Sequence, residues 1–330
     1  MIWIYFTLLI LTLLAIDLGV LHKKGQELNH RKAAIETTFW VSIALLFSLA
    51  VLWLYKSGYV DNPKNLRPSD ALVKYITGYL IELSLSVDNL FVIAFIFTSF
   101  KIPTKFQHWV LFWGILGAIV FRASLIGVGV ILINKISWMT YVFGLFLLFT
   151  AFRMLSHSDD DEDEGQSKMS NRIRRWLKVS KNLNGNKFWT RENGKKLATP
   201  LLAALVMIEI TDVMFALDSI PAILAVTTDP FIVYSSNMFA ILGLRSLYFF
   251  LAHMLRKFHY LKYSVFAILV FVSIKLLASH HMEFPEWFSL TFIGVSLIMG
   301  IIVSLQKRKQ KVARWREAKK AERRKRSTRE

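Results

Sequence analysis

Long apolar runs alternate with short charged segments along the whole chain. Nine runs are long enough to cross a bilayer, because about 20 helical residues span a hydrocarbon core of about 30 Å. They cover residues 2–21, 36–55, 70–99, 107–133, 136–155, 199–226, 231–255, 262–279 and 286–306. The pattern predicts an all-α polytopic membrane protein with about nine transmembrane helices. It excludes an ordinary soluble enzyme, in which charged and apolar residues are mixed, and a disordered chain, which is poor in apolar residues.

Basic residues in the connections predict the orientation, because cytoplasmic loops carry an excess of Lys and Arg. The first connection has four basic residues between positions 23 and 32, whereas 227–230 and 280–285 have none. We therefore expect the N-terminus outside and the C-terminus inside, with a transmembrane domain over 1–306 and a cytoplasmic tail over 307–330. The first apolar run lacks a basic segment before it, so we expect a retained helix rather than a cleaved signal peptide.

Charge outside the predicted spans lies mainly in two segments. The long connection 156–198, expected in the cytoplasm, has an acidic run from Asp159 to Glu164, which is typical of a solvated, flexible segment. A regulatory or metal-concentrating role is the alternative. The tail 307–330 has 13 Lys and Arg against 3 Glu, more than half of the net charge of +18. Such a tail favours anionic lipid, at on the order of 1 kcal/mol per basic residue. Without an accompanying nucleic-acid-binding motif, we expect no specific nucleic-acid partner.

The third to fifth apolar runs resemble the sixth to eighth. In runs 70–99 and 199–226, an acidic residue is followed six positions later by a second acidic residue with a polar neighbour. These residues are Glu82, Asp88 and Asn89 in the first run and Asp212, Asp218 and Ser219 in the second. The next runs share an Ile-Leu-Gly triplet before Arg122 and Arg245. Because the two sets begin on opposite sides, the pattern predicts two inverted three-helix repeats, spans 3–5 and 6–8. Many secondary transporters have this architecture and bind substrate near the midplane; chance recurrence is the alternative.

Five carboxylates fall inside the predicted spans. They are Glu82, Asp88, Glu209, Asp212 and Asp218. A charged residue at the centre of a membrane helix costs about 2.5–3.5 kcal/mol on insertion scales, so these groups must be protonated, paired or bound to a cation. Glu209 and Asp212 are three residues apart and share a helix face. Pro221, three residues after Asp218, predicts a kink or break in that span.

Three interpretations of these carboxylates are open. In the first they only pair with Arg122 and Arg245, although two arginines do not neutralise five acids. In the second they form a proton relay. In the third, which we favour, they bind a metal ion and also exchange protons, with Asn89 and Ser219 as neutral ligands beside Glu82, Asp88, Glu209, Asp212 and Asp218. A chain without cysteine, and with no histidine in these two spans, favours Mg²⁺, Mn²⁺ or Ca²⁺.

The other charges in or near the spans are expected to support this site or to lie at the membrane interface. We expect Arg122 and Arg245, which are deep in their spans, to have carboxylate partners. Asp17 is expected to pair with His22 and Lys23 near the inner end of the first span, with a gating role as the alternative. Lys275, near an outer helix end, is expected to snorkel to the interface.

Several motifs make the chain similar to the TerC family of bacterial membrane proteins, and to its Alx-like branch in particular. The motifs are Glu82-Leu83-Ser84-Leu85-Ser86-Val87-Asp88-Asn89-Leu90, Glu209-Ile210-Thr211-Asp212, Ala216-Leu217-Asp218-Ser219-Ile220-Pro221-Ala222, Gly185-Asn186-Lys187-Phe188-Trp189-Thr190-Arg191-Glu192-Asn193-Gly194 and Phe239-Ala240-Ile241-Leu242-Gly243-Leu244-Arg245-Ser246. The resemblance covers roughly residues 1–305. It implies a polytopic protein of the bacterial inner membrane, linked to manganese efflux, alkaline pH and tellurium resistance. The family's intramembrane acidic residues map onto the five carboxylates above.

The leading hypothesis is a transporter that exports divalent metal cations, Mn²⁺ foremost, through the midplane carboxylates. The alternative is a membrane scaffold or metalation partner for other membrane or secreted proteins, with the long connection and the tail as its working parts. The sequence has no metalloprotease, serine-hydrolase or thiol motif, so we expect no enzyme and no prosthetic group. The expected partners are the bilayer, the transported ion and anionic lipid; the oligomeric state stays open.

Overall fold

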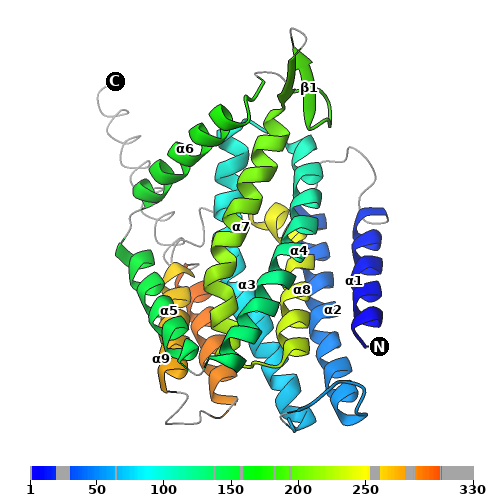
Figure 1. Cartoon of the computed structure of the whole chain (residues 1–330), viewed down its shortest axis with the longest axis vertical. Helices are drawn as coiled ribbons and strands as arrows, with labels where there is room; N and C mark the ends of the chain where they lie inside the picture. Colours follow the sequence, from blue (N-terminus) through cyan, green and yellow to red (C-terminus); the bar gives the residue numbers. More distant parts are fainter. Residues whose placement is uncertain are drawn as a thin grey trace, which may run out of the picture.

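The computed structural model describes residues 2–19, 30–63, 65–136, 138–156, 159–180, 183–192, 195–252, 261–278, 285, 287–304 and 306. Helices dominate this part of the chain (Figure 1). In order, the elements are α1 (Ile2–Gly19), α2 (His30–Lys56), α3 (Pro68–Ser99), α4 (Thr104–Lys135), α5 (Met139–Ser156), α6 (Asp159–Trp176), β1 (Trp189–Glu192), β2 (Lys195–Ala198), α7 (Pro200–Leu224), α8 (Pro230–Ala252) and α9 (Leu261–Ala278). A further helix covers Trp287–Ser304.

A helix lies on each of the nine predicted apolar segments, as far as these segments are described. Four of the helices have the length and composition of a membrane span: Arg31–Lys56, Thr104–Lys135, Pro200–Leu224 and Trp287–Ser304. The chain is thus a polytopic helical membrane protein, while the number of nine spans stays a prediction. Three helices begin at a proline, whose fixed φ and missing N–H suit the first helical position.

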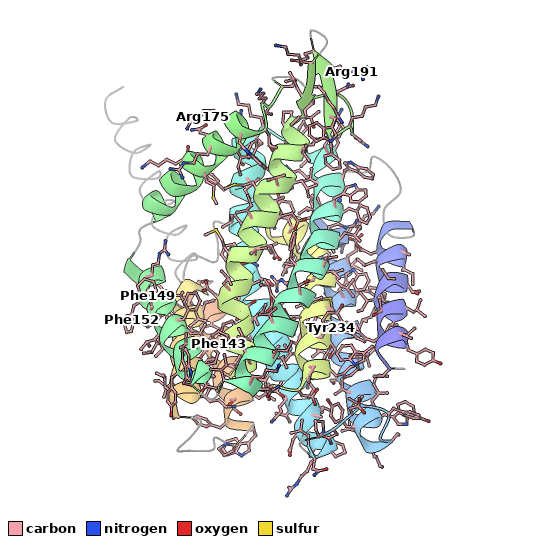
Figure 2. All side chains as sticks on the ribbon, in the orientation of Figure 1. Phe143, Phe149, Phe152, Arg175, Arg191 and Tyr234 are labelled. Carbon is pink, nitrogen blue, oxygen red and sulfur yellow. The ribbon has the colours of Figure 1, made fainter. Side chains whose placement is uncertain are left out.

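The apolar residues divide between the packed interior and the outer surface. Trp40, Tyr75 and Phe231 are almost fully buried between helices. Phe149 and Phe152 of α5 are 62% and 55% exposed and project outward (Figure 2). Large exposed apolar side chains are unusual on a soluble protein but suit a surface that faces lipid.

α7 differs from the expectation drawn from Pro221. The helix runs from Pro200 to Leu224 with Pro221 inside it, so it is not broken at the proline. The proline lies in the last turn, where the backbone hydrogen bond from Ala225 N to Pro221 O still forms at 3.1 Å. The proline has no N–H to donate to the carbonyl four residues before it, yet the helix continues through this position to Leu224.

Corresponding helices of the two sets of three run antiparallel to each other. Gly78, near the start of α3, packs against Ile223 at the end of α7. The ring of His108, near the start of α4, stacks on Phe249 near the end of α8, with 3.9 Å between ring centroids. Gly144, near the start of α5, packs against the end of α9. The contacts between helices that are not counterparts match as well: α3 packs along α8, and α7, the counterpart of α3, packs along α4, the counterpart of α8.

α6 and the β1–β2 hairpin lie at one end of the bundle, hereafter the α6 end (Figure 1). Here the acidic run, expected to be flexible, is instead the first part of a helix. The acidic residues at its start and Arg174 and Arg175 in its last turn both complement the helix dipole. Arg174 Nη2 donates to Ser99 O at 2.5 Å, which fastens α6 to the end of α3. The antiparallel hairpin is the one departure from an all-α fold in the described chain.

The N-terminus of α1 points away from the α6 end, beside the other half of the bundle (Figure 1). Trp3 contacts the rings of Phe231 and Tyr234 at the start of α8, 5.8 Å away between centroids in both cases. The N-terminus and the 156–198 segment are therefore at opposite ends, as the predicted topology requires. The assignment of the α6 end to the cytoplasm stays a prediction.

Candidate functional site

Four helices meet at the guanidinium of Arg122, which is completely buried in the middle of α4. Its Nη2 and Nε donate to the two carboxylate oxygens of Asp212 on α7, at 2.8 and 3.2 Å. Its Nη1 donates to Asn237 Oδ1 on α8 at 3.2 Å and pairs with the carboxylate of Glu82 on α3. We call Glu82, Arg122, Asp212 and Asn237 the central network.

The central network explains how charged residues tolerate the interior of the bundle. Glu82 and Asp212 both lie near the middle of their helices, and Glu82 is 1% exposed. A buried carboxylate is stable when a cation and further hydrogen bonds compensate its lost hydration. The planar guanidinium can satisfy two carboxylates at once. The expected carboxylate partners of Arg122 are thus confirmed.

Several buried side-chain oxygens of α3 and α7 have no hydrogen-bond partner among the described residues. They are Glu82 Oε2, Ser86 Oγ, Asn89 Oδ1, Glu209 Oε2 and Ser219 Oγ. A buried polar atom without a partner costs about 1–3 kcal/mol, and more when it is charged. Such a concentration of oxygens calls for an explanation, and binding of a cation, a proton or water satisfies them chemically.

Glu209 lies one helical turn before Asp212 and faces α4. Its carboxylate packs on the backbone of Gly117, so closely that a Cβ at position 117 would overlap it. The glycine of the Ile-Leu-Gly triplet therefore has a structural reason, which is to admit the Glu209 side chain. Glu209 and Asp212 share a face of α7, as their spacing predicted.

A cavity of about 30 Å³ lies between α3, α4, α7 and α8. Its polar lining comes from Asn89, Thr211, Asp212 and Arg245, and the rest is apolar. A water needs roughly 10–15 Å³ of such volume, so the cavity has room for a small ion or a few waters. It is too small for an organic substrate.

Arg245 pairs with Asp17, for which the sequence predicted other partners. Its Nη2 donates to Asp17 Oδ2 at 3.1 Å and to Asp17 O at 2.9 Å. Asp17 is 4% exposed. Asp17 thus has a buried partner on α8, whereas His22 and Lys23 lie outside the described residues, so their expected pairing with Asp17 stays a prediction. The carboxylate partner expected for Arg245 is confirmed, and it joins α1 to α8.

The remaining predicted site residues lie at varied places. Asp218 is half-buried and is attracted electrostatically by Arg153 of α5 rather than by Arg122. The backbone of Asp88 belongs to α3, but its side chain lies outside the described residues. Lys275 is 8% exposed and donates from Nζ to Ser289 Oγ at 3.0 Å, so the expectation that it snorkels was wrong.

The described side chains do not gather the predicted carboxylates into one cage. Among them, no group of three or more His, Cys, Asp or Glu residues is arranged to hold a metal ion. Glu82 and Asp212 converge on Arg122, with Glu209 beside them, and Asp218 lies apart.

Asn237 is a member of the central network that the sequence analysis missed. It follows Ser235 and Ser236 in an apolar run, and all three residues are fully buried. Three consecutive polar residues in a predicted span are a signal that should have marked it.

The fold and the central network define the class: an integral membrane protein with a buried ionic network where four helices meet. Residues 68–312 match the integral membrane protein TerC family, and the chain belongs to this family. An uncharacterized membrane protein of Myxococcus xanthus, STKORF319, is 44% identical over 305 residues, 92% of each chain. A putative membrane-bound redox modulator, Alx, of Photorhabdus laumondii is 41% identical over 312 residues, 94% of this chain and 96% of the relative. No solved structure matches the chain.

Proposed function

We propose that this protein exports divalent metal cations, Mn²⁺ foremost, across the bacterial inner membrane through the carboxylates at the centre of the bundle. The observation that carries the proposal is the central network beside a small cavity, with unpartnered oxygens of Glu82, Asn89 and Glu209 close by. Ionisable groups at this depth in a membrane protein are a functional signal by default.

The charge and the ligand atoms suit a divalent cation. Glu82, Glu209 and Asp212 carry three negative charges when ionised, and Arg122 carries one positive charge, so an excess of two negative charges remains. The available donors are carboxylate, amide and hydroxyl oxygens, and the chain has no cysteine. Oxygen donors suit hard and intermediate cations such as Mg²⁺, Ca²⁺ and Mn²⁺. The preference for Mn²⁺ among them comes from the family resemblance.

The packing of the helices supports alternating access. α3, α4 and α5 run antiparallel to α7, α8 and α9 respectively, and the cross-contacts of the two sets correspond. Two inverted repeats of this kind let a transporter open first to one side and then to the other by exchanging the conformations of the repeats. Metal entry from the cytoplasm would displace protons from the carboxylates, and reprotonation on the other side would favour release.

Mn²⁺ flux into proteoliposomes tests the proposal. We expect Asp212→Asn to lower the flux at least tenfold, because it removes a charged oxygen from the lining of the cavity. Asp88→Asn and Asp218→Asn should lower it as well if these two acidic residues, marked by the sequence alone, belong to the metal path. Asp70→Asn, in the first turn of α3 and far from the cavity, is the matched control and should keep the wild-type flux. Wild-type flux in the Asp88 and Asp218 variants would remove these two residues from the site. If folded wild-type protein carries no divalent ion at all, the transporter proposal fails.

A second candidate is a scaffold or metalation partner for other proteins. Its support is the surface at the α6 end, where Trp176 is 75% exposed and follows exposed Arg175 on α6, and where Arg191 is exposed on the separate hairpin (Figure 2). A large exposed aromatic among basic residues suits contact with a partner. Trp176→Ala and deletion of 307–330 separate the two candidates, because a scaffold should lose function in cells while Mn²⁺ flux in vesicles should survive.

A further inference from the structure

The two buried arginines that follow the Ile-Leu-Gly triplets pair with carboxylates on different helices. Arg122 comes five residues after its glycine and holds the central carboxylates. Arg245 comes only two residues after its glycine and holds Asp17. Three residues are almost one helical turn, so Arg245 sits farther from the α6 end than residue 248, the position that would correspond to Arg122. At this position Arg245 contacts Asp17 of α1, a helix that precedes both repeats.

Arg245 also borders the metal path that we propose. It lines the same cavity as Asp212, Asn89 and Thr211. The guanidinium thus has an acidic partner in Asp17, is attracted by Glu36 of α2 as well, and shares the cavity with the carboxylate of Asp212. Its side chain has several rotatable bonds, so a change of rotamer can redirect it without a movement of α8.

The contact with Asp17 has the form of an anchor. Arg245 Nη2 binds both the carboxylate and the backbone carbonyl of Asp17. Asp17 lies in the last turn of α1, where carbonyls have no partner within the helix. The anchor is also built on a peripheral helix, since α1 contacts chiefly α8 among the described helices.

Release of a divalent cation leaves negative charge behind in a medium of low dielectric, which is costly unless another cation replaces it. Arg122 is already shared by Glu82, Asp212 and Asn237. Among the described residues that line the cavity, Arg245 is the other cation.

We propose that Arg245 exchanges Asp17 for Asp212 when the metal ion leaves, and so acts as a tethered counter-ion that competes with the metal. Asp17 is then a positioning residue, because it holds Arg245 away while metal is bound. The inference rests on the proposed metal-binding function.

Calorimetric titration of the purified full chain with Mn²⁺ tests the exchange. Asp17→Asn removes the anchor and should raise the Kd for Mn²⁺ at least tenfold, because Arg245 then stays at Asp212. Adding Arg245→Gln to this variant should bring the Kd back to within about threefold of wild type. Adding Arg245→Lys instead should not, because lysine keeps the competing charge. Asp70→Asn is the control for the loss of an acidic residue elsewhere.

The lysine and glutamine pair separates competition from a purely structural role, since both shorten the side chain and both lose the forked contact with Asp17. An equal Kd in the two double variants overturns the exchange, and so does an Asp17→Asn variant that folds and keeps the wild-type Kd. If the wild-type protein does not bind Mn²⁺, the proposed function fails together with this inference. Wild-type binding with no effect of Asp17→Asn leaves the proposed function standing and removes only the exchange.

Discussion

Replacing Arg122 by glutamine is the most direct perturbation of the central network. Glutamine keeps a polar head but removes the positive charge and the three hydrogen bonds to Asp212 and Asn237. It leaves the carboxylates of Glu82 and Asp212 facing each other in the interior. Breaking a buried ion pair by removing one partner costs about 3–5 kcal/mol. We expect a loss of this size in the free energy of unfolding, a large part of the roughly 5–15 kcal/mol that typically stabilises a protein.

Equilibrium unfolding in mixed micelles, followed by circular dichroism, measures the loss. The control is Arg175→Gln on α6, because Arg175 is exposed and its side chain, as far as the structure describes its partners, donates one long hydrogen bond of 3.4 Å within its own helix. We expect less than about 0.5 kcal/mol there. A triple variant that adds Glu82→Gln and Asp212→Asn removes the uncompensated charges and should recover most of the stability. The reasoning is refuted if Arg122→Gln costs less than about 1 kcal/mol, or if the triple variant is no more stable than the single one.

Two further substitutions test the packing around the site. Gly117→Ala should displace the Glu209 carboxylate and lower both the stability and the Mn²⁺ affinity of the protein. Gly127→Ala on the same helix, where a Cβ meets nothing within 4 Å, should be neutral or stabilising by up to about 1 kcal/mol. Comparable unfolding curves and Mn²⁺ titrations for the two variants would contradict the fit of Glu209 against α4. Arg174→Gln should free α6 from the end of α3 and speed amide hydrogen exchange in α6, whereas Arg175→Gln should not change the exchange rate. Equal exchange rates in both variants would show that Arg174 does not fasten α6 to α3.

The helices were predictable because their signal is local. An apolar run long enough to cross a bilayer forms a helix whatever it packs against, since no other open structure satisfies the backbone hydrogen bonds in lipid. The same locality explains two errors. Asp159 to Glu164 was expected to be flexible because of its charge, but a favourable helix dipole and the contact of Arg174 with α3 hold this segment in α6. Pro221 was expected to kink or break α7, but the helix continues through it to Leu224 without a break.

The carboxylates and arginines of the candidate site were identified from their position in apolar runs, and the two arginines do have carboxylate partners. The sequence alone marked these residues, because charge inside a span is costly wherever the helix lies. It did not tell which acid meets which arginine. Arg122 and Asp212 are 90 residues apart, and Arg245 and Asp17 are 228 apart. Such pairs depend on how each helix is rotated and where it crosses its neighbours, and only the tertiary packing decides that.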